Sequence, residues 1–347
     1  MNCKNILIFP SGNFPSKRAS SINIVNHAKS FAKKGFSVDL VHTNLNFEFI
    51  EKPKNVNLIY LEISKFKKII FFLKTIISKK YLFIFSRDMF ISFLFGFRFK
   101  VIHDLHVFPK YLGTKYNLLF TICYKLFSNV QFLCISKLLF DDVVDYYGYS
   151  KKIYKINDVS GWKIENDFKV NNPLRICYFG SLDKSKNWEI ITDLAINFKT
   201  DSFYVYTFSD ISKIDNRYFS IENLNFIFDK TYQELEVEIK QNVDIILIPN
   251  LKKQNLRGVD IGRHTSPLKL FDALVSNKIV ILNNLEIFEE FTKINNLFFT
   301  YNTEISSWIN KVKEIKELIK NNQLELGDNN FEFPLTYDER VNKIFQL

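Results

Sequence analysis

The sequence predicts an α/β fold with two domains, each built on a parallel sheet flanked by helices. Its 347 residues exceed the roughly 250 to 300 at which a single hydrophobic core stops growing. Hydrophobic residues make up 47% of the chain and charged residues 24%, which is the range of ordinary globular proteins. A strand, a loop, a helix and a further strand follow one another twice along the chain. This alternation is typical of parallel sheets covered by helices.

The first alternation begins near the N-terminus. Asn5–Phe9 is a short apolar run that predicts a strand, and a polar loop over 11–18 follows it. The next apolar residues recur at helical spacing, at Ile24, Val25, Ala28, Phe31 and Ala32. They predict a helix that Ser20 or Ser21 can cap and that Gly35 can end.

Other apolar runs have the length of further strands, and in the first half these are Phe36–Val41, Val56–Leu61, Leu82–Phe85, Lys100–His103 and Gln131–Ile135. The second alternation starts with a strand at Leu174–Phe179, a loop at Gly180–Lys186 and a helix at Trp188–Phe198. Its remaining predicted strands are Ser202–Thr207, Leu224–Phe228, Val243–Pro249 and Lys278–Leu282. A polar stretch over 163–173 separates the halves, so we expect domains at 1–165 and 166–334, with a ligand cleft at the carboxyl ends of their strands.

Charge and cysteine content exclude several classes of protein. Lys and Arg number 47 against 37 for Asp and Glu, so the net charge is +10 and anionic partners are favoured. Four cysteines show no CxxC pair and no histidine at metal spacing, which indicates a reducing, cytoplasmic setting without disulfides or zinc. The N-terminal apolar run is too short for a secretory signal, and no run approaches the roughly 20 residues of a spanning helix. The positive charge is not gathered on a recognisable nucleic-acid module, so we expect no nucleic-acid partner.

The segment from Thr265 to Leu274 carries the sharpest local signal. Ser266 is a good N-cap and Pro267 suits the first helical position, so a helix is expected to start here. Lys269 falls in its first turn, and free N–H groups, a helix dipole and an ammonium group together favour an anion such as a diphosphate. An ordinary capped helix with no ligand explains the same residues.

A longer pattern surrounds that helix start. Val243–Pro249 combines an Asp with an apolar strand ending in Pro, and Ser266–Val275, the strand Lys278–Leu282 and the segment Asn283–Glu290 follow. This order resembles the donor-binding region of glycosyltransferase family 4, whose members have the GT-B fold of two facing Rossmann-like domains. The resemblance implies an enzyme of that fold that uses a nucleotide-diphosphate sugar.

The resemblance assigns roles in both halves. The residues that it implies for donor binding are Gly180, Ser181, His264, Ser266, Pro267, Leu268, Asp272 and Glu290. Lys186 and Lys269 would stabilise the leaving diphosphate, and Asp272 stands where the family has the glutamate that holds the ribose. The residues expected on the acceptor side are Arg18, Arg87 and Asp104. The segment 335–347 is similar to the family's C-terminal helix, which returns to the first domain.

Two histidines are candidates for the transferring centre. His103 lies in Val101-Ile102-His103-Asp104, which resembles the family's Glu-x-His-Asp strand end, and the family's histidine lies beside the donor sugar. His106 comes three residues later, which in a continued strand would place it on the opposite face, so it ranks second. Many family members also carry two glutamates separated by seven intervening residues. With Asp272 as the second, the first of these positions is His264 here. Because that first acid usually contacts the donor sugar, its absence leaves two questions open. One is which donor the chain uses, and the other is whether the chain is catalytically silent.

The implied reaction is glycosyl transfer with retention of configuration. No Asp-x-Asp metal motif occurs in the chain, so stabilisation of the leaving group would fall to Lys186, Lys269 and the helix start at Ser266. We therefore expect neither a metal ion nor another cofactor. The resemblance implies that the leaving phosphate accepts the acceptor's proton, so no protein base is expected and Asp104 is not assigned as one.

A basic, acid-free stretch bears on the acceptor. From Ile63 to Arg87 there is no Asp or Glu, and lysines alternate with Phe, Ile and Leu, as in helices that lie on anionic membranes. A solvated basic helix packed on the sheet has the same pattern. We expect a lipid-linked saccharide acceptor of bacterial capsule or lipopolysaccharide assembly, and a peripheral location on the inner face of the cytoplasmic membrane. A GT-B sugar-nucleotide epimerase and a silent partner in glycan assembly are the alternatives.

Overall fold

The chain folds into two compact units. Unit 1 is Met1–Gly161 together with Tyr337–Leu347, and unit 2 is Trp162–Thr336. The computed structural model describes residues 4–15, 19–44, 53–62, 64–78, 81–167, 169–253, 255–256, 259–264, 267–301, 303–324, 331 and 333–347. The boundary thus falls four residues before the one expected from the sequence, and the returning segment begins at Tyr337.

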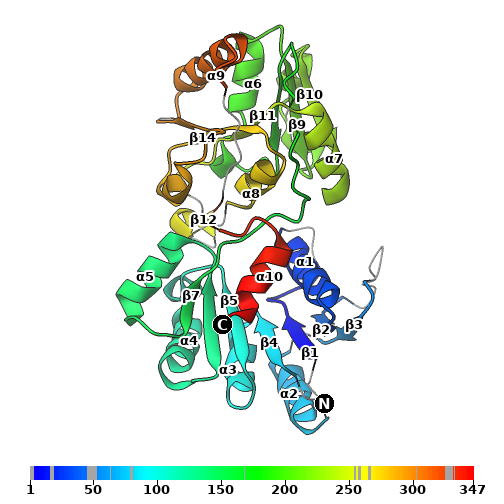
Figure 1. Ribbon diagram of the computed structural model, residues 1–347, viewed down its shortest axis with the longest axis vertical. Coiled ribbons are helices and arrows are strands. Elements are labelled where there is room, and N and C mark those ends of the chain that lie inside the picture. The colour runs from blue at the N-terminus through cyan, green and yellow to red at the C-terminus, as the bar shows by residue number, and fades with distance from the viewer. Residues whose placement is uncertain are drawn as a thin grey trace. The chain divides into compact units, whose positions relative to one another are not determined.

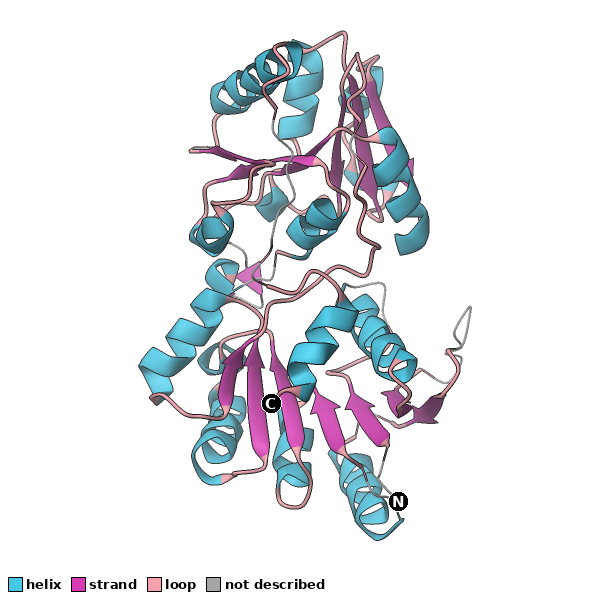
Figure 2. Ribbon diagram, in the orientation of Figure 1, coloured by secondary structure: helices cyan, strands magenta, loops and turns pink. Residues whose placement is uncertain are grey.

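Unit 1 is a parallel sheet with helices on both faces (Figures 1 and 2). In the described part of the chain its seven strands run in the order β3-β2-β1-β4-β5-β6-β7. Their bounds are β1 Asn5–Phe9, β2 Ser37–His42, β3 Val56–Tyr60, β4 Phe83–Ser86, β5 Val101–Leu105, β6 Val130–Cys134 and β7 Ile153–Lys155. The helices are α1 Ala19–Lys33, α2 Lys65–Ser78, α3 Met89–Gly96, α4 Thr114–Leu126, α5 Lys137–Tyr147 and α10 Tyr337–Phe345, with a 3₁₀ turn η1 at Pro109–Leu112.

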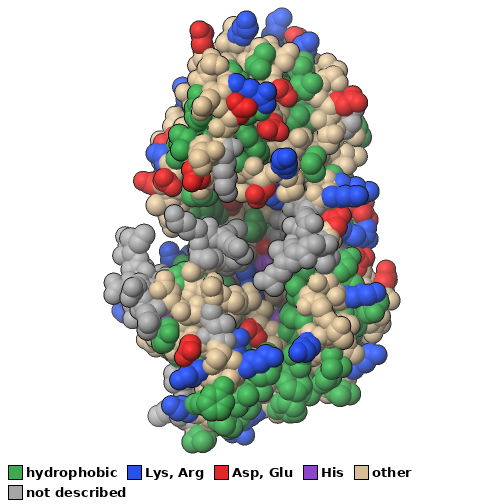
Figure 3. All heavy atoms as spheres, turned by 180° about the vertical axis from the view of Figure 1, so that it is seen from behind, with side chains coloured by type: hydrophobic (Ala, Val, Ile, Leu, Met, Phe, Trp, Pro, Cys, Tyr) green, Lys and Arg blue, Asp and Glu red, His purple; other side chains and the backbone are tan. Residues whose placement is uncertain are grey.

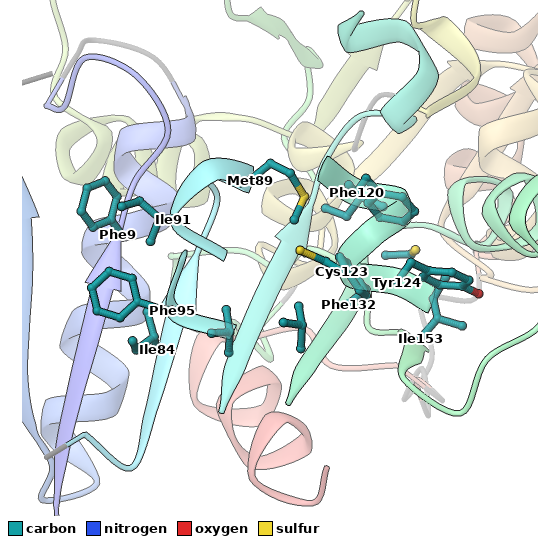
Figure 4. Packing of buried hydrophobic residues seen from close by; sticks show 14 of the residues in the cluster. Phe9, Ile84, Met89, Ile91, Phe95, Phe120, Cys123, Tyr124, Phe132 and Ile153 are labelled. Atoms are coloured by element: carbon teal, nitrogen blue, oxygen red, sulfur yellow. The ribbon is translucent and has the colours of Figure 1, made fainter. Parts of the chain in front are cut away.

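Two hydrophobic cores lie on the two faces of this sheet. The core under α1 and α10 contains Phe31 and Val341, and the core under α2 to α5 contains a large aromatic group. Figure 4 shows part of that second core, in which the Phe120 ring lies 4.7 Å from Phe132 and 5.4 Å from Tyr124 between ring centroids. Burying an aromatic side chain contributes about 1.5 to 3 kcal/mol, so part of the phenylalanine excess serves to fill this core.

Strand β5 positions functional side chains because it is covered on both faces. All five of its residues are buried, although two of them are His103 and Asp104. Adjacent residues of a strand point to opposite faces. His103 accordingly contacts α3 and α4, whereas Asp104 contacts Arg340 of α10.

Unit 2 repeats the architecture. In the described residues its six parallel strands run in the order β10-β9-β8-β11-β14-β15. Their bounds are β8 Arg175–Phe179, β9 Ser202–Thr207, β10 Leu224–Phe228, β11 Ile245–Ile248, β14 Ile279–Asn283 and β15 Leu297–Thr300, with a small hairpin of β12 Asn255–Leu256 and β13 Val259–Asp260. The helices are α6 Ile190–Asn197, α7 Tyr232–Asn242, α8 Leu268–Val275 and α9 Ile305–Lys320. The 3₁₀ turns are η2 Lys184–Lys186, η3 Ile211–Lys213, η4 Asn216–Ser220, η5 Gly262–His264 and η6 Glu286–Phe291.

The prediction of two α/β domains with parallel sheets is confirmed, while several element boundaries were wrong. Helix α1 begins at Ala19, so positions 20 and 21 lie inside it and not at its N-cap position. Gly35 does end the helix, because its φ of 85° lets Phe36 N–H donate back to the Phe31 carbonyl. Edge strands β7 and β15 were missed, since a run of only three or four residues is too short a pattern to recognise.

Candidate functional site

The loop after β8 holds the first group of predicted residues. Gly180 ends this strand with a φ of 132°, a backbone conformation that other residues rarely adopt. Ser181 Oγ donates to Asp183 Oδ2 at 2.8 Å, and the Ser181 carbonyl accepts from the Tyr178 hydroxyl at 2.5 Å. Lys186 lies in the following turn η2. Because β8, β11 and β14 are parallel, this loop lies at the edge of the sheet where their carboxyl ends meet.

Lys269 of α8 reaches the same loop. Its Nζ lies 4.1 Å from the centroid of the Tyr178 ring, and a Cβ atom on residue 180 would lie 2.5 Å from that Nζ. Only a glycine therefore leaves room for the ammonium group beside the strand end. The Lys269 Nζ is buried and donates to no hydrogen-bond acceptor among the residues that the structure describes. A buried ammonium group without an acceptor is costly, so it marks a place where an anion would be stabilised.

The pKa values of Lys186 and Lys269 also indicate a place where an anion would be stabilised. Burial, and secondly the charge of Lys186, hold the pKa of Lys269 well below its usual range. Burial also lowers the pKa of Lys186, and Asp183 only partly restores it. An anion placed between them would raise both pKa values again, because it favours the protonated form. The pair can therefore bind a diphosphate and take up protons as it does so.

Other predicted donor residues occupy nearby elements of unit 2. Asp272 of α8 is buried and accepts a hydrogen bond of 2.6 Å from the Tyr232 hydroxyl at the start of α7. Tyr232 was not predicted, since no sequence spacing links it to α8. His264 is fully buried in η5, and Glu290 is half-buried in η6.

The predicted start of α8 is displaced by one residue. The helix begins at Leu268 and Pro267 is its N-cap, with the Pro267 carbonyl accepting from Leu270 N at 2.8 Å. The expectation that Pro267 occupies the first helical position was therefore wrong, because its ψ of 54° is not helical. Ser266, the predicted cap, lies outside the described residues, as does Arg18 of the predicted acceptor side.

Unit 1 contains a second group of predicted residues around Asp104. Arg87 donates to Asp104 Oδ2 from Nε at 2.9 Å and from Nη2 at 2.7 Å, and Arg340 Nη2 donates to Oδ1 at 2.6 Å. His106 Nε2 lies 2.7 Å from Oδ2. Burial would raise the pKa of Asp104, but Arg340, His106 and Arg87 together hold it well below its usual range. Asp104 is thus an ionised, saturated acceptor and is unsuited to act as a base.

The cluster extends through Asp158 and His27. Asp158 Oδ1 accepts from Asn23 Nδ2 at 3.0 Å and lies 3.9 Å from Arg340 Nη1. His27 Nδ1 donates to the Asn23 carbonyl at 2.8 Å, so its Nε2 is free to accept from Arg340 at 2.5 Å. Burial and the Arg340 charge lower the pKa of His27 to about 3. This imidazole is a neutral structural acceptor at physiological pH.

The two candidate histidines differ in exposure. His103 is fully buried, with Nδ1 2.8 Å from Ser92 Oγ and Nε2 3.2 Å from the Tyr116 hydroxyl. Burial lowers its pKa to about 4. His106 follows the end of β5, and its side chain is 26% exposed. Because the strand stops at Leu105, the alternation argument that ranked His106 second does not apply, and His106 is the one of the two that solvent reaches.

Two further properties concern metals and membranes. In the described part of the chain, no group of three or more His, Cys, Asp or Glu side chains is arranged to hold a metal ion. Among the helices of that part, none is both long enough and apolar enough to cross a bilayer.

No protein-family model matches the chain, and a search of curated proteins found no similar sequence. Solved structures of similar fold do exist. Sucrose-phosphate synthase from Thermosynechococcus elongatus gives a TM-score of 0.69 at 13% identity, over 98% of this chain and 94% of that one. The lipopolysaccharide outer core galactosyltransferase WaaB, in its apo form, gives 0.64 at 12% identity over 99% of each chain. UDP-GlcNAc 2-epimerase from Neisseria meningitidis, bound to UDP-GlcNAc, also gives 0.64 at 12% identity, over 99% and 98%.

These likenesses cover nearly the whole chain in each case. Together with the two parallel sheets of seven and six strands, they show that the chain has the GT-B fold. That outcome confirms the fold expected from the sequence, while the narrower likeness to glycosyltransferase family 4 rests on the motifs alone.

Proposed function

We propose that the chain is a glycosyltransferase that moves a sugar, with retention of configuration, from a nucleotide-diphosphate sugar to a saccharide acceptor. The observation that carries this proposal is Lys269. Its buried Nζ lies beside the strand end at Gly180 with Lys186 as its charged neighbour, and the attraction of Asp183 does not offset the effect of burial. Two cations at one strand end suit the two phosphates of such a donor.

In the proposed reaction each residue does a limited task. Lys269 and Lys186 stabilise the charge that develops on the diphosphate as it leaves. Ser181 and the backbone after Gly180 shape the loop against the phosphates, and Asp272 holds the ribose. His106, being partly exposed, takes the place beside the donor sugar for which His103 ranked first. The leaving phosphate accepts the acceptor's proton, so the reaction uses neither a protein base nor a metal ion.

The acceptor in this proposal is a glycan carried on lipid, as in capsule or lipopolysaccharide assembly, and the protein acts at the inner face of the cytoplasmic membrane. The support comes from the basic, acid-free stretch around α2. One solved structure of the same fold is named as a lipopolysaccharide galactosyltransferase.

A second candidate is a sugar-nucleotide epimerase. It is favoured by the fold likeness to the Neisseria enzyme bound to UDP-GlcNAc. An epimerase would use the same diphosphate site but would convert its substrate without any acceptor. A third candidate, a silent partner that binds nucleotide without turnover, is motivated by His264 at the position of the family's first acid.

One screen separates the three candidates. The full chain is incubated with UDP-, GDP- and related sugars, with and without membrane extract, and both released nucleotide and new sugar nucleotides are measured. Nucleotide release that depends on membrane extract supports the transferase. A new sugar nucleotide formed without extract supports the epimerase, and binding without turnover across the panel supports the silent partner. No binding of any nucleotide sugar contradicts the assignment of the site.

A further inference from the structure

Helix α2 carries apolar side chains on the face that it turns to solvent. Phe66 is 69% exposed, Ile69 38%, Leu73 53% and Ile77 87%. These positions are three or four residues apart, so they form one stripe along the helix. The opposite face is also apolar and packs on α3 and β1, where Phe72 lies 5.0 Å from Phe95 and Phe71 lies 6.4 Å from Phe9 between ring centroids. A helix packed on its own sheet needs only one apolar face, and the second is unexplained by the fold.

Lysines border this stripe on both sides. At 100° per residue, Lys67 and Lys74 flank it on one side and Lys65 on the other, and all three are exposed. The fourth lysine of the helix, Lys68, turns inward and pairs with Asp88 at 2.5 Å. The carboxylate of Glu62 lies 4.0 Å from Lys67, and both side chains are more than half exposed.

The neighbouring helices continue this surface. Helix α3 contacts both α2 and α4, and exposed apolar residues on or next to α3 and α4 are Phe97, Leu118 and Leu126. Figure 3 shows hydrophobic and basic side chains gathered on this side of unit 1, and we call the outer side of α2, α3 and α4 the basic apolar face. Between residues 63 and 140 the sequence has only two acids. Asp88 caps α3 and pairs with Lys68, and Asp104 is buried, so neither offsets the positive charge of the face.

We propose that the basic apolar face docks on the surface of an anionic lipid bilayer, with the α2 stripe inserted at the level of the headgroups. An acidic protein partner would account for the lysines but not for four apolar side chains in a row between them. At a bilayer, the apolar stripe enters the acyl boundary while the flanking lysines extend to the lipid phosphates. The inference deepens the proposed function, since it rests on a lipid-borne acceptor for its purpose, although the docking itself needs neither donor nor acceptor.

Co-sedimentation with vesicles tests the proposal. The full chain should sediment with vesicles that contain phosphatidylglycerol and stay in solution with vesicles of phosphatidylcholine alone. Leu73→Ser combined with Ile77→Ser should reduce the partition coefficient at least about tenfold, because it removes two of the four apolar side chains of the stripe. The matched control is Ile196→Ser with Val237→Ser, which removes apolar residues that are 53% and 52% exposed on α6 and α7 of unit 2.

Charge is tested in the same assay. A lysine near an anionic surface strengthens partitioning about fivefold, so Lys67→Gln with Lys74→Gln should weaken it roughly 25-fold. Lys313→Gln with Lys320→Gln on α9, which removes two exposed lysines from unit 2, should change it little. Circular dichroism of every variant checks that the fold is retained.

A reporter within the stripe gives a reading at residue level. All three tryptophans, Trp162, Trp188 and Trp308, lie in unit 2 and are buried, so Phe66→Trp adds one distinguishable emission. The added emission should shift to shorter wavelength when anionic vesicles are added. Equal sedimentation of the stripe variants and their controls would overturn the proposal. So would self-association that depends on the stripe without any vesicle binding, which would make a second copy the occupant. Nucleotide binding measured on the same variants should be unchanged, so failure of docking is distinct from failure of the proposed transferase site.

Discussion

Buried cations are treated differently in the two units. In unit 1, Arg87 and Arg340 are buried against Asp104, with Asp158 nearby, so two positive charges face two negative ones. In unit 2, the buried Nζ of Lys269 faces an aromatic ring and the charge of Lys186. The first arrangement is complete within the protein, whereas in the second the described residues give the Lys269 Nζ no hydrogen-bond acceptor.

This difference separates structure from function. A buried ion pair commonly contributes little net stability, but removing one member leaves an uncompensated charge and is strongly destabilising. A buried cation that lacks a partner already destabilises the fold, and the binding of an anion can offset that unfavourable free energy. We therefore expect variants of unit 1 cations to change folding and variants of unit 2 cations to change binding.

The largest expected effect is on unit 1. Arg340→Met should lower its free energy of unfolding by about 3 to 5 kcal/mol, because Asp104 and Asp158 lose a shared partner. Urea unfolding followed by circular dichroism measures the loss, and hydrogen exchange in β5 and α10 locates it. Arg217→Met is the control, since that exposed arginine contacts Asp215 and Tyr218 at the surface and its loss should change stability little. If both variants lower stability equally, the buried ion pairs of unit 1 are no more important for folding than an exposed one.

Next comes Lys269→Ala, which should reduce turnover by about 10² to 10³-fold while the protein stays folded. Asp272→Ala should also abolish donor binding or turnover, through loss of the ribose contact. For both variants, calorimetry measures nucleotide binding and a nucleotide-release assay measures turnover. The control is Lys184→Ala, which removes an exposed lysine from the turn η2 that also holds Lys186. Wild-type rates in the two site variants would show that the donor site lies elsewhere.

Acid should destabilise unit 1 by a few kcal/mol between about pH 6.5 and pH 4. The folded state lowers the pKa of His27 to about 3 and of His103 to about 4, so over this range the unfolded chain binds protons that the folded chain excludes. Stability therefore falls as the pH falls. Denaturant unfolding at several pH values measures the slope, and His103→Gln should make it shallower. A slope that the substitution leaves unchanged would mean that His103 is protonated in the fold.

Gly180→Ala should weaken nucleotide binding about tenfold, because the added methyl group displaces the Lys269 ammonium and also strains the backbone. Gly148→Ala separates these two causes. Gly148 also has a positive φ, of 85°, but a Cβ atom there meets nothing within 4 Å. The control should lose stability without losing affinity. Equal affinities would mean that the position of Lys269 does not matter.

The smallest expected effect is that of chelation. We expect EDTA to leave turnover unchanged, because in the proposed reaction Lys186 and Lys269 stabilise the leaving diphosphate without a metal ion. The assay compares initial rates with EDTA, without EDTA and with added Mg²⁺. Loss of activity that Mg²⁺ restores would contradict the metal-free proposal.

Much of the architecture follows from local patterns in the sequence. Runs such as Asn5–Phe9 and Ser202–Thr207 are strands because covered parallel sheets need apolar residues on both faces. Gly180, Lys186 and Lys269 could be named together because a strand end and a nearby helix start have recognisable residues. Tyr178, the neighbour of Gly180 and Lys269, could not, since nothing in β8 indicates which ring will lie under the ammonium group.

Long-range pairing was the other limit. Asp104 and Arg340 are 236 residues apart in the chain, and Tyr232 and Asp272 are 40 apart, so no spacing rule connects them. The ranking of His103 above His106 had a local cause. It assumed that the strand continues past Leu105, whereas β5 ends there. The sequence also does not indicate which of the adjacent residues His103 and Asp104 points toward α3 and α4.

The return of α10 to unit 1 has a consequence for synthesis. Arg340 follows all of unit 2 in the chain, so a ribosome has translated residues 162–336 before Asp104 can meet its second arginine. Unit 2, which is one continuous segment, can complete its fold first. Until then unit 1 lacks α10, and Asp104 lacks the ion pair with Arg340. A premature stop codon anywhere in unit 2 therefore also removes this part of unit 1.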